Sequence, residues 1–111
     1  MDRIEHYREI VKDLIREYAA CKPSYGQVEV EAVLDDDIGH YTLTYTGWIG
    51  DERINGDVIH IDIRDDKIWV QHDGTNIGIV DELLEAGVPK EHIVLGWLSP
   101  SERQQLNFAV C

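Results

Sequence analysis

Positive charge is scarce in this sequence. Ten basic residues stand against 22 acidic ones, which gives a formal net charge of −12, and the basic residues are scattered without forming a run. Proteins gain most of their affinity for DNA and RNA from Lys and Arg side chains that displace the counterions of phosphates. The composition therefore argues against direct binding to nucleic acid or to anionic membranes, and it favours proteins with basic surfaces as partners.

Cysteine and long hydrophobic runs are scarce as well. The two cysteines, Cys21 and Cys111, are separated by a distance that fits neither a disulfide framework nor a metal-binding motif. No stretch approaches the roughly 18 apolar residues that a membrane span needs, and the N-terminus has no apolar signal region. We expect a cytoplasmic protein without a membrane anchor.

The sequence does contain enough apolar side chains for one folded domain. Its 111 residues are 43% hydrophobic and 29% charged, which is typical of a globular protein. A chain of this length buries about two-thirds of the surface that it exposes when unfolded. We therefore expect a single domain over residues 1–111, without repeats or a linker.

Helical periodicity marks the first segment. Apolar side chains recur at steps of three and four residues, at Ile4, Tyr7, Val11, Leu14, Ile15 and Tyr18. This spacing predicts a helix from Asp2 to Cys21 with one apolar face, and Pro23 follows as a stop signal.

The middle of the chain alternates with a period of two, which is the pattern of half-buried strands. Four such segments occur at residues 27–34, 40–49, 58–64 and 67–71, with a polar loop over residues 50–56. A two-residue turn after the third segment pairs Ile63 with Ile68, so two apolar side chains lie opposite each other on one face. The same register pairs Asp62 with Trp69 on the other face. The four segments predict an antiparallel meander.

The last third predicts two helices with a short apolar run between them. Thr75 is a candidate N-cap for a helix over residues 76–86, which a following glycine and proline end. The run at residues 93–98 fits either a buried strand or an extended connector.

A capping box predicts the final helix. Ser99, Pro100 and Glu102 occupy the N-cap, N1 and N3 positions, and the helix would continue to about Ala109. The fold class is therefore α+β: an N-terminal helix, a four-stranded antiparallel β-meander, and two C-terminal helices packed on one face of the sheet.

A metal site is the first chemical possibility on this fold. His60 and Asp62 share a strand face with Gln71 on the neighbouring strand, but the spacing fixes no third strong ligand. The aspartate triplet at residues 35–37 lacks the alternating ligands of a calcium loop, so we interpret it as a solvated turn. We expect no metal and no cofactor.

Catalysis has little support from the sequence. Asp65 and Lys67 have the D-x-K spacing of metal-dependent nucleases, yet they fall in a tight turn with no clearly placed acidic ligand upstream. The sequence contains no P-loop, Rossmann or G-x-S-x-G pattern. It therefore identifies no catalytic residue and predicts that the protein is not an enzyme.

Two tryptophans stand out because alternation places Trp48 and Trp69 on the polar face of the sheet. A large apolar ring is out of place there unless something covers it. We predict an interface for a basic protein or for a second copy of the chain, with Glu29, Glu31 and Asp62 around the rings. In the alternative interpretation the rings pack over polar stems at an edge, or a bulge at the preceding glycine turns Trp48 inward.

Two strings resemble the XisI family, the fdxN element excision controlling factors. GVPKEHIVLGW at residues 87–97, followed by Pro100 and Arg103, resembles the signature region, and YTLTYTGW at residues 41–48 resembles the family as well. With the N-terminal helix, the resemblance covers nearly the whole chain. The sequence departs from the family pattern at Asn76 (usually acidic), Trp97 (usually Phe) and Asn107 (usually Glu). These departures change surface charge and leave the fold unaltered.

The resemblance implies a cyanobacterial-type accessory protein that helps control excision of a DNA element during heterocyst differentiation. It implies a site-specific recombinase and a companion called XisH, whose relatives resemble restriction nucleases, and it supplies no catalytic residues. Together with the acidic charge, it predicts a non-enzymatic regulator that binds a DNA-processing protein such as a XisH-like partner. A metal-dependent nuclease-like enzyme and a single-stranded nucleic-acid-binding module that stacks bases on Trp48 and Trp69 are the alternatives.

Overall fold

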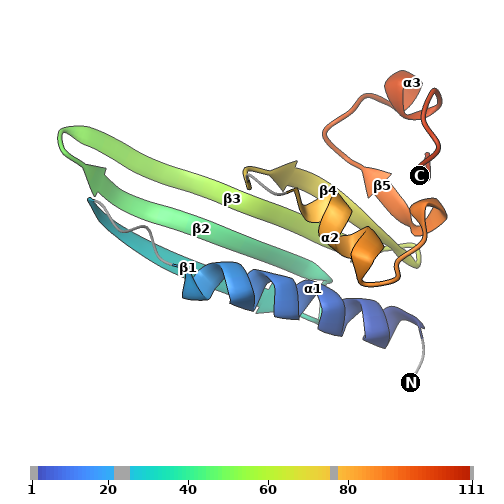
Figure 1. Ribbon diagram of the computed structural model, residues 1–111, viewed down its shortest axis with the longest axis horizontal. Coiled ribbons are helices and arrows are strands. Elements are labelled where there is room, and N and C mark those ends of the chain that lie inside the picture. Colours follow the sequence, from blue (N-terminus) through green and yellow to red (C-terminus); the bar gives the residue numbers. More distant parts are fainter. Residues whose placement is uncertain (1–2, 22–25, 76–77, 111) are drawn as a thin grey trace.

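The fold is a five-stranded sheet with helices on one of its faces (Figure 1). The computed structural model describes residues 3–21, 26–75 and 78–110. In chain order the elements are α1 (Arg3–Ala20), β1 (Gln27–Asp35), β2 (His40–Ile49), β3 (Glu52–Arg64), β4 (Lys67–Asp73), α2 (Ile79–Glu85), the 3₁₀ helix η1 (Lys90–His92), β5 (Ile93–Leu95) and α3 (Pro100–Arg103). The predicted α+β class is confirmed.

Helix α1 supplies one half of the core. Tyr7, Val11 and Ile15 are the buried residues on its inner side, as their spacing predicts, and they pack against isoleucines of the sheet. The helix matches the predicted one, except that Asp2 lies outside the described residues. None of the described helices is both long and apolar enough to cross a membrane.

A hydrogen-bonded network fixes α1 to the turn between β1 and β2. Lys12 Nζ donates to Asp36 Oδ2 over 2.9 Å, and the Tyr41 hydroxyl donates to Asp36 Oδ1 over 2.7 Å. These hydrogen bonds, that from Lys12 first, lower the pKa of the Asp36 carboxyl. The aspartate triplet does form a turn, but its middle residue anchors a helix.

Next to its turn, the β3–β4 hairpin has the register that the sequence predicts, and a bulge between His60 and Ile61 then pairs His60 with His72. Ile63 pairs with Ile68, and Asp62 pairs with Trp69. Asp65 and Asp66 form the turn with φ of 55° and 63°. A turn whose two central residues both have positive φ has a backbone twist that matches the twist of the strands it joins. Aspartate adopts positive φ more readily than most residues.

The sheet has one strand more than the predicted meander. Strand β5 pairs with β4 in parallel, with Ile93 opposite Ile68 and Leu95 opposite Val70. Helix α2 makes the crossover, because a parallel neighbour cannot be reached by a tight turn. All three residues of β5 are buried, which explains why the run is apolar without alternation.

The predicted polar loop over residues 50–56 is wrong. Strand β3 begins at Glu52, so β2 and β3 form one long hairpin that extends beyond the helices at one end of the sheet (Figure 1). Asn55 and Asp57 are exposed there. Polar residues can occupy this part of the strand because no helix covers it.

The second helix is shorter than predicted and is capped differently. Helix α2 starts at Ile79 after Gly78. The predicted N-cap Thr75 does accept the backbone N–H three residues on, that of Gly78 over 3.1 Å, but this bond falls just before the helix and not on its first turn. Instead the Asp73 carboxylate, at the end of β4, accepts the Ile79 N–H over 2.7 Å. Asn76 lies outside the described residues.

The capping box at Ser99 and Glu102 is confirmed, but the helix that it starts is four residues long. The prediction of a helix to Ala109 is therefore wrong. The Ala109 N–H donates to the Ile93 carbonyl over 3.0 Å, and Ala109 forms a parallel bridge with Val94. The tail thus satisfies backbone groups along the free edge of β5. Helices α1 and α2 cover the sheet, whereas α3 lies beyond β5 and buries no residue (Figure 1).

Two glycines of the long hairpin allow a matched test of this geometry. Gly47 has φ of 153°, and a Cβ there would overlap the backbone oxygen of Gln27, whereas Gly56 has open space around it. We expect Gly47→Ala to lower the free energy of unfolding by about 2 kcal/mol or more through overpacking and strain. Gly56→Ala should leave it nearly unchanged. Urea denaturation of both variants checks this, and equal losses would contradict the pairing of β1 with β2.

Candidate functional site

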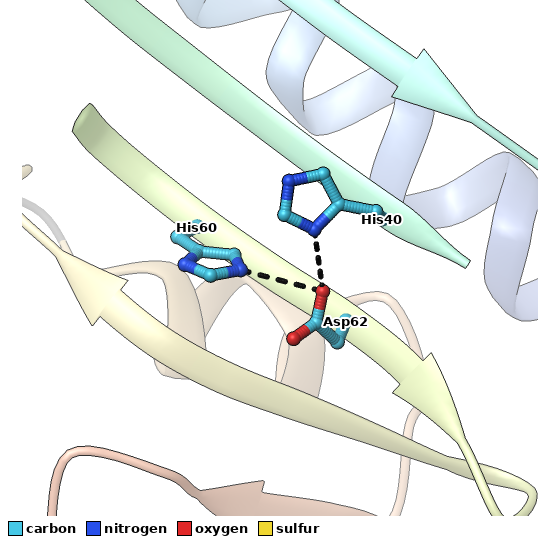
Figure 2. Close-up of side chains that lie close together, drawn as sticks. All are labelled: His40, His60 and Asp62. Carbon is cyan, nitrogen blue, oxygen red and sulfur yellow. Dashed lines mark hydrogen bonds and ion pairs between the residues drawn. The ribbon is translucent and has the colours of Figure 1, made fainter. Parts of the chain in front are cut away.

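Three polar side chains meet on the sheet face that the helices leave uncovered. His40 of β2 pairs with Asp62 of β3, and His60 lies two residues before Asp62 on the same strand. His40 Nδ1 is 2.9 Å and His60 Nε2 is 3.3 Å from Asp62 Oδ1. Figure 2 shows both imidazoles directed at this oxygen. We call these three residues the His–His–Asp cluster.

The two oxygens of Asp62 have different partners. Oδ1 faces both imidazoles, while Oδ2 accepts a hydrogen bond from Gln71 Nε2 over 3.2 Å and lies 3.4 Å from the Arg64 guanidinium. The Asp62 side chain is 18% exposed, against 28% for His60 and 37% for His40. Partners on both oxygens therefore hold the carboxylate in one orientation, with Oδ1 facing the histidines.

Opposing effects act on the ionisation of Asp62. Burial, the largest effect, works to raise the pKa of its carboxyl, but hydrogen bonds from His40 and Gln71 and the nearby charge of His60 together outweigh it. The net pKa is lowered. Asp62 therefore carries its negative charge throughout the neutral range.

Sequence reasoning found His60, Asp62 and Gln71 and missed His40. Sequence spacing identified no third strong ligand, but the β2–β3 register places His40 directly opposite Asp62. Within the described ranges, this is the one group of three or more His, Cys, Asp or Glu side chains whose ligand atoms lie close enough together to hold an ion. A bulge between Leu43 and Thr44 shifts the register, so counting pairs from the β2–β3 turn would have placed Ile61, and not Asp62, opposite His40.

Trp69 lies beside this cluster and is partly covered by the chain itself. The guanidinium carbons of Arg64 and Arg103 lie 4.6 and 5.4 Å from its ring centroid. Its indole Nε1 is buried and has no hydrogen-bond partner among the described residues. The second covering group comes from α3, an element that strand alternation alone does not place on this face.

Trp48 lies at the other end of the same face. It is 48% exposed, and it pairs regularly with Gln27 and Arg53, so no bulge turns it inward. Eight residues of β2 separate it from His40, or about 26 Å along the strand. Trp48 and Trp69 therefore do not form one aromatic centre.

Glu29 and Glu31 are exposed on β1, where they pair with Thr46 and Thr44. Glu29 lies nearer to Trp48 than to the His–His–Asp cluster, whereas the partner of Glu31 is four residues of β2 from both Trp48 and His40. The predicted interface set thus divides into one group at the hairpin end and another around Asp62. Its role in binding a partner stays a prediction.

The whole chain matches one family model. The model described as XisI protein matches residues 1–110. The chain belongs to the XisI family. This confirms the resemblance that the two strings indicate. Comparison with curated proteins found no match.

Two solved structures of the family resemble the present fold along its full length. A XisI-like protein from Anabaena variabilis ATCC 29413 is 41% identical, with a TM-score of 0.90 over 99% of this chain and 100% of that one. The fdxN element excision controlling factor XisI from the same organism is 32% identical, with a TM-score of 0.84 over the same shares. The fold described above is therefore that of the XisI family.

The lowered pKa of Asp62 makes a pH-dependent contribution to stability. A carboxyl whose folded-state pKa is below its ordinary value of 3.8 stabilises the fold above that value, and the contribution is lost as the pH falls through the folded-state pKa. We expect the wild type to unfold at higher urea than Asp62→Asn at pH 6, with the gap closing below about pH 4. In a His40→Gln background the gap at pH 6 should be smaller, because the hydrogen bond from His40 that lowers this pKa is lost. A gap that stays constant down to pH 3 would contradict the assignment.

Proposed function

We propose that this protein regulates the site-specific excision of a DNA element, and that it does so by binding a DNA-processing protein. The observation that carries the proposal is membership of the XisI family over residues 1–110. A relative that is 32% identical over 99% of this chain is named as an fdxN element excision controlling factor. Regulation of excision is therefore the process in which this chain is expected to act.

The distribution of charge supports a protein partner. The net charge is −12, and Glu29 and Glu31 are exposed on β1 beside the strand that carries Trp48. An aromatic ring next to carboxylates matches an interface for a basic surface. The basic surface with which a recombinase or nuclease contacts DNA would be attracted to this end of the sheet.

The nuclease-like alternative gains no support from the D-x-K spacing. Asp65 is one of the two central residues of a tight turn, and Asp66 lies 3.8 Å from Arg3, with which it forms an exposed ion pair. Neither aspartate belongs to a group of ligands within the described ranges. Turn geometry accounts for these residues without catalysis.

The base-stacking alternative is weakened by the position of the tryptophans. Trp69 is partly covered by two guanidinium groups, and Trp48 lies about 26 Å away along the strands. Successive stacked bases need neighbouring open rings. The two tryptophans do not provide such a platform.

A XisH-like protein is the partner that we propose. Co-expression of the two chains with separate tags should give a complex that elutes as one species in size-exclusion chromatography at about 0.15 M salt. High salt should weaken it, because electrostatic attraction is part of the association. If neither tag retains the other chain even at low salt, the proposed partner is wrong.

Trp48 and Trp97 form a matched pair for locating the interface. They are 48% and 49% exposed. Trp97 follows β5, however, and belongs to neither strand of the β2–β3 hairpin. Truncating a central interfacial tryptophan typically costs about 2 kcal/mol, or roughly thirtyfold in affinity. We expect Trp48→Ala to weaken binding of the XisH-like protein by about that factor and Trp97→Ala to leave it unchanged, as measured by titration calorimetry.

Both variants should melt within a few degrees of the wild type, because each ring is about half exposed. Equal affinity of all three proteins for the partner would exclude the hairpin end as the interface. In that case the surface around Trp69 would be the next to test.

A further inference from the structure

We propose that His40, His60 and Asp62 bind a divalent transition-metal ion of the Zn²⁺ class on the uncovered face of the sheet. The site is distinct from the hairpin end with Trp48, and it does not depend on the proposed regulatory function. Figure 2 shows the three side chains converging from two adjacent strands.

The spacing of the donor atoms suits such an ion. Bonds of about 2.0–2.1 Å in tetrahedral geometry place neighbouring ligand atoms about 3.3–3.4 Å apart. The two nitrogen-to-oxygen distances in the cluster are 2.9 and 3.3 Å, and one ligand atom from each of the three residues lies within 4.8 Å of the others. Small rotations of the imidazoles would bring all three to bonding distance without moving the strands.

The surroundings of Asp62 orient its Oδ1 toward the position that the ion would occupy. Gln71 Nε2 donates to Oδ2 over 3.2 Å, which leaves Oδ1 directed at the histidines. Hydrogen bonds from outside the ligand set that orient a ligand are typical of metal sites, and removing one commonly lowers affinity tenfold to a hundredfold. Gln71 is therefore a positioning residue for the ion.

The donor types select the class of ion. Two imidazoles and one carboxylate suit Zn²⁺, Co²⁺, Ni²⁺ or Fe²⁺, whereas Mg²⁺ and Ca²⁺ prefer sites made of oxygen atoms alone. Three protein ligands leave at least one coordination position open. All three side chains are partly exposed, so water or a side chain from another protein can reach that position.

Charge near the cluster acts in both directions. The Asp62 carboxylate and the net charge of −12 attract a cation. The Arg64 guanidinium, 3.4 Å from Asp62 Oδ2, repels a cation, but the Arg64 side chain is 53% exposed, so water and salt screen its effect. A hollow of about 250 Å³ adjoins the cluster at His40 and Asp62, but Arg64 lines it and His60 does not.

The competing account is a cluster of hydrogen bonds that binds no ion. In that case each imidazole nitrogen that faces Asp62 Oδ1 carries a proton and donates it. An ion would need the same nitrogens without their protons. Zinc titration separates the two accounts.

The experiment uses the full chain without an affinity tag, stripped with a chelator and titrated with Zn²⁺ against a competing indicator. We expect one equivalent to bind. His40→Gln and His60→Gln should each lower affinity at least tenfold, and Gln71→Leu should lower it about tenfold. His6→Gln is the matched control, because His6 is an exposed histidine on α1, the helix on the opposite face of the sheet, and it should bind as the wild type does.

A second measurement guards against loss of folding in the variants. Zn²⁺ in excess should raise the melting temperature of the wild type and of His6→Gln, and it should leave that of His60→Gln unchanged, because an ion that binds only the native state stabilises it. Binding that all variants retain would place the ion elsewhere and overturn the proposal. The absence of binding to the wild type at micromolar Zn²⁺ would overturn it as well.

Discussion

The antiparallel pairing of β2 with β3 is the constraint on which the other features of the molecule depend. It is the longest pairing in the sheet, and it contains a bulge between Leu43 and Thr44. Because side chains alternate between the faces of a strand, a slip of one residue would exchange the buried and exposed sets. The same register that buries Tyr41 against Ile61 places His40 against Asp62. Core and polar cluster are thus two faces of one pairing.

Helix α1 depends on that pairing through polar contacts as well as apolar ones. Tyr41 is fully buried, yet its hydroxyl reaches Asp36, which in turn holds Lys12 of the helix. Near the C-terminal end of α1, the Tyr18 hydroxyl donates to Glu82 of α2 over 2.6 Å, and burial together with that bond raises the pKa of Tyr18 to about 12. Specific bonds at the middle of the amphipathic helix and near its C-terminal end therefore act together with the packing of its apolar side.

Local patterns in the sequence were enough for most of the fold. Periodicity gave α1 and the four strands of the meander, and hydrogen-bonding capacity at Ser99 and Glu102 gave the start of α3. Errors arose where long-range pairing outweighed local pattern. Residues 52–57 are polar but belong to a strand because β2 lies beside them, and Ala109 leaves the predicted helix because the edge of β5 offers backbone partners.

The candidate site shows the same division. Alternation placed His60, Asp62 and Trp69 on the correct face, since it needs only the sequence of one strand at a time. Identifying His40 required the register between β2 and β3. The loop predicted between these two strands was too long, so the register could not be counted. The covering of Trp69 by Arg103 required knowing where the chain goes after β5, which no local signal records.

The pairing of Ala109 beside β5 has a consequence for the opposite side of the sheet. With that edge occupied, β1 is the strand within the described residues whose outer edge no other segment pairs. An open edge invites strand-to-strand stacking between molecules, and charged side chains are the usual protection against it. Glu29 and Glu31 lie on β1, so two copies that approached edge to edge would bring carboxylates together. Repulsion between the acidic residues of this strand therefore opposes pairing of two sheets through β1.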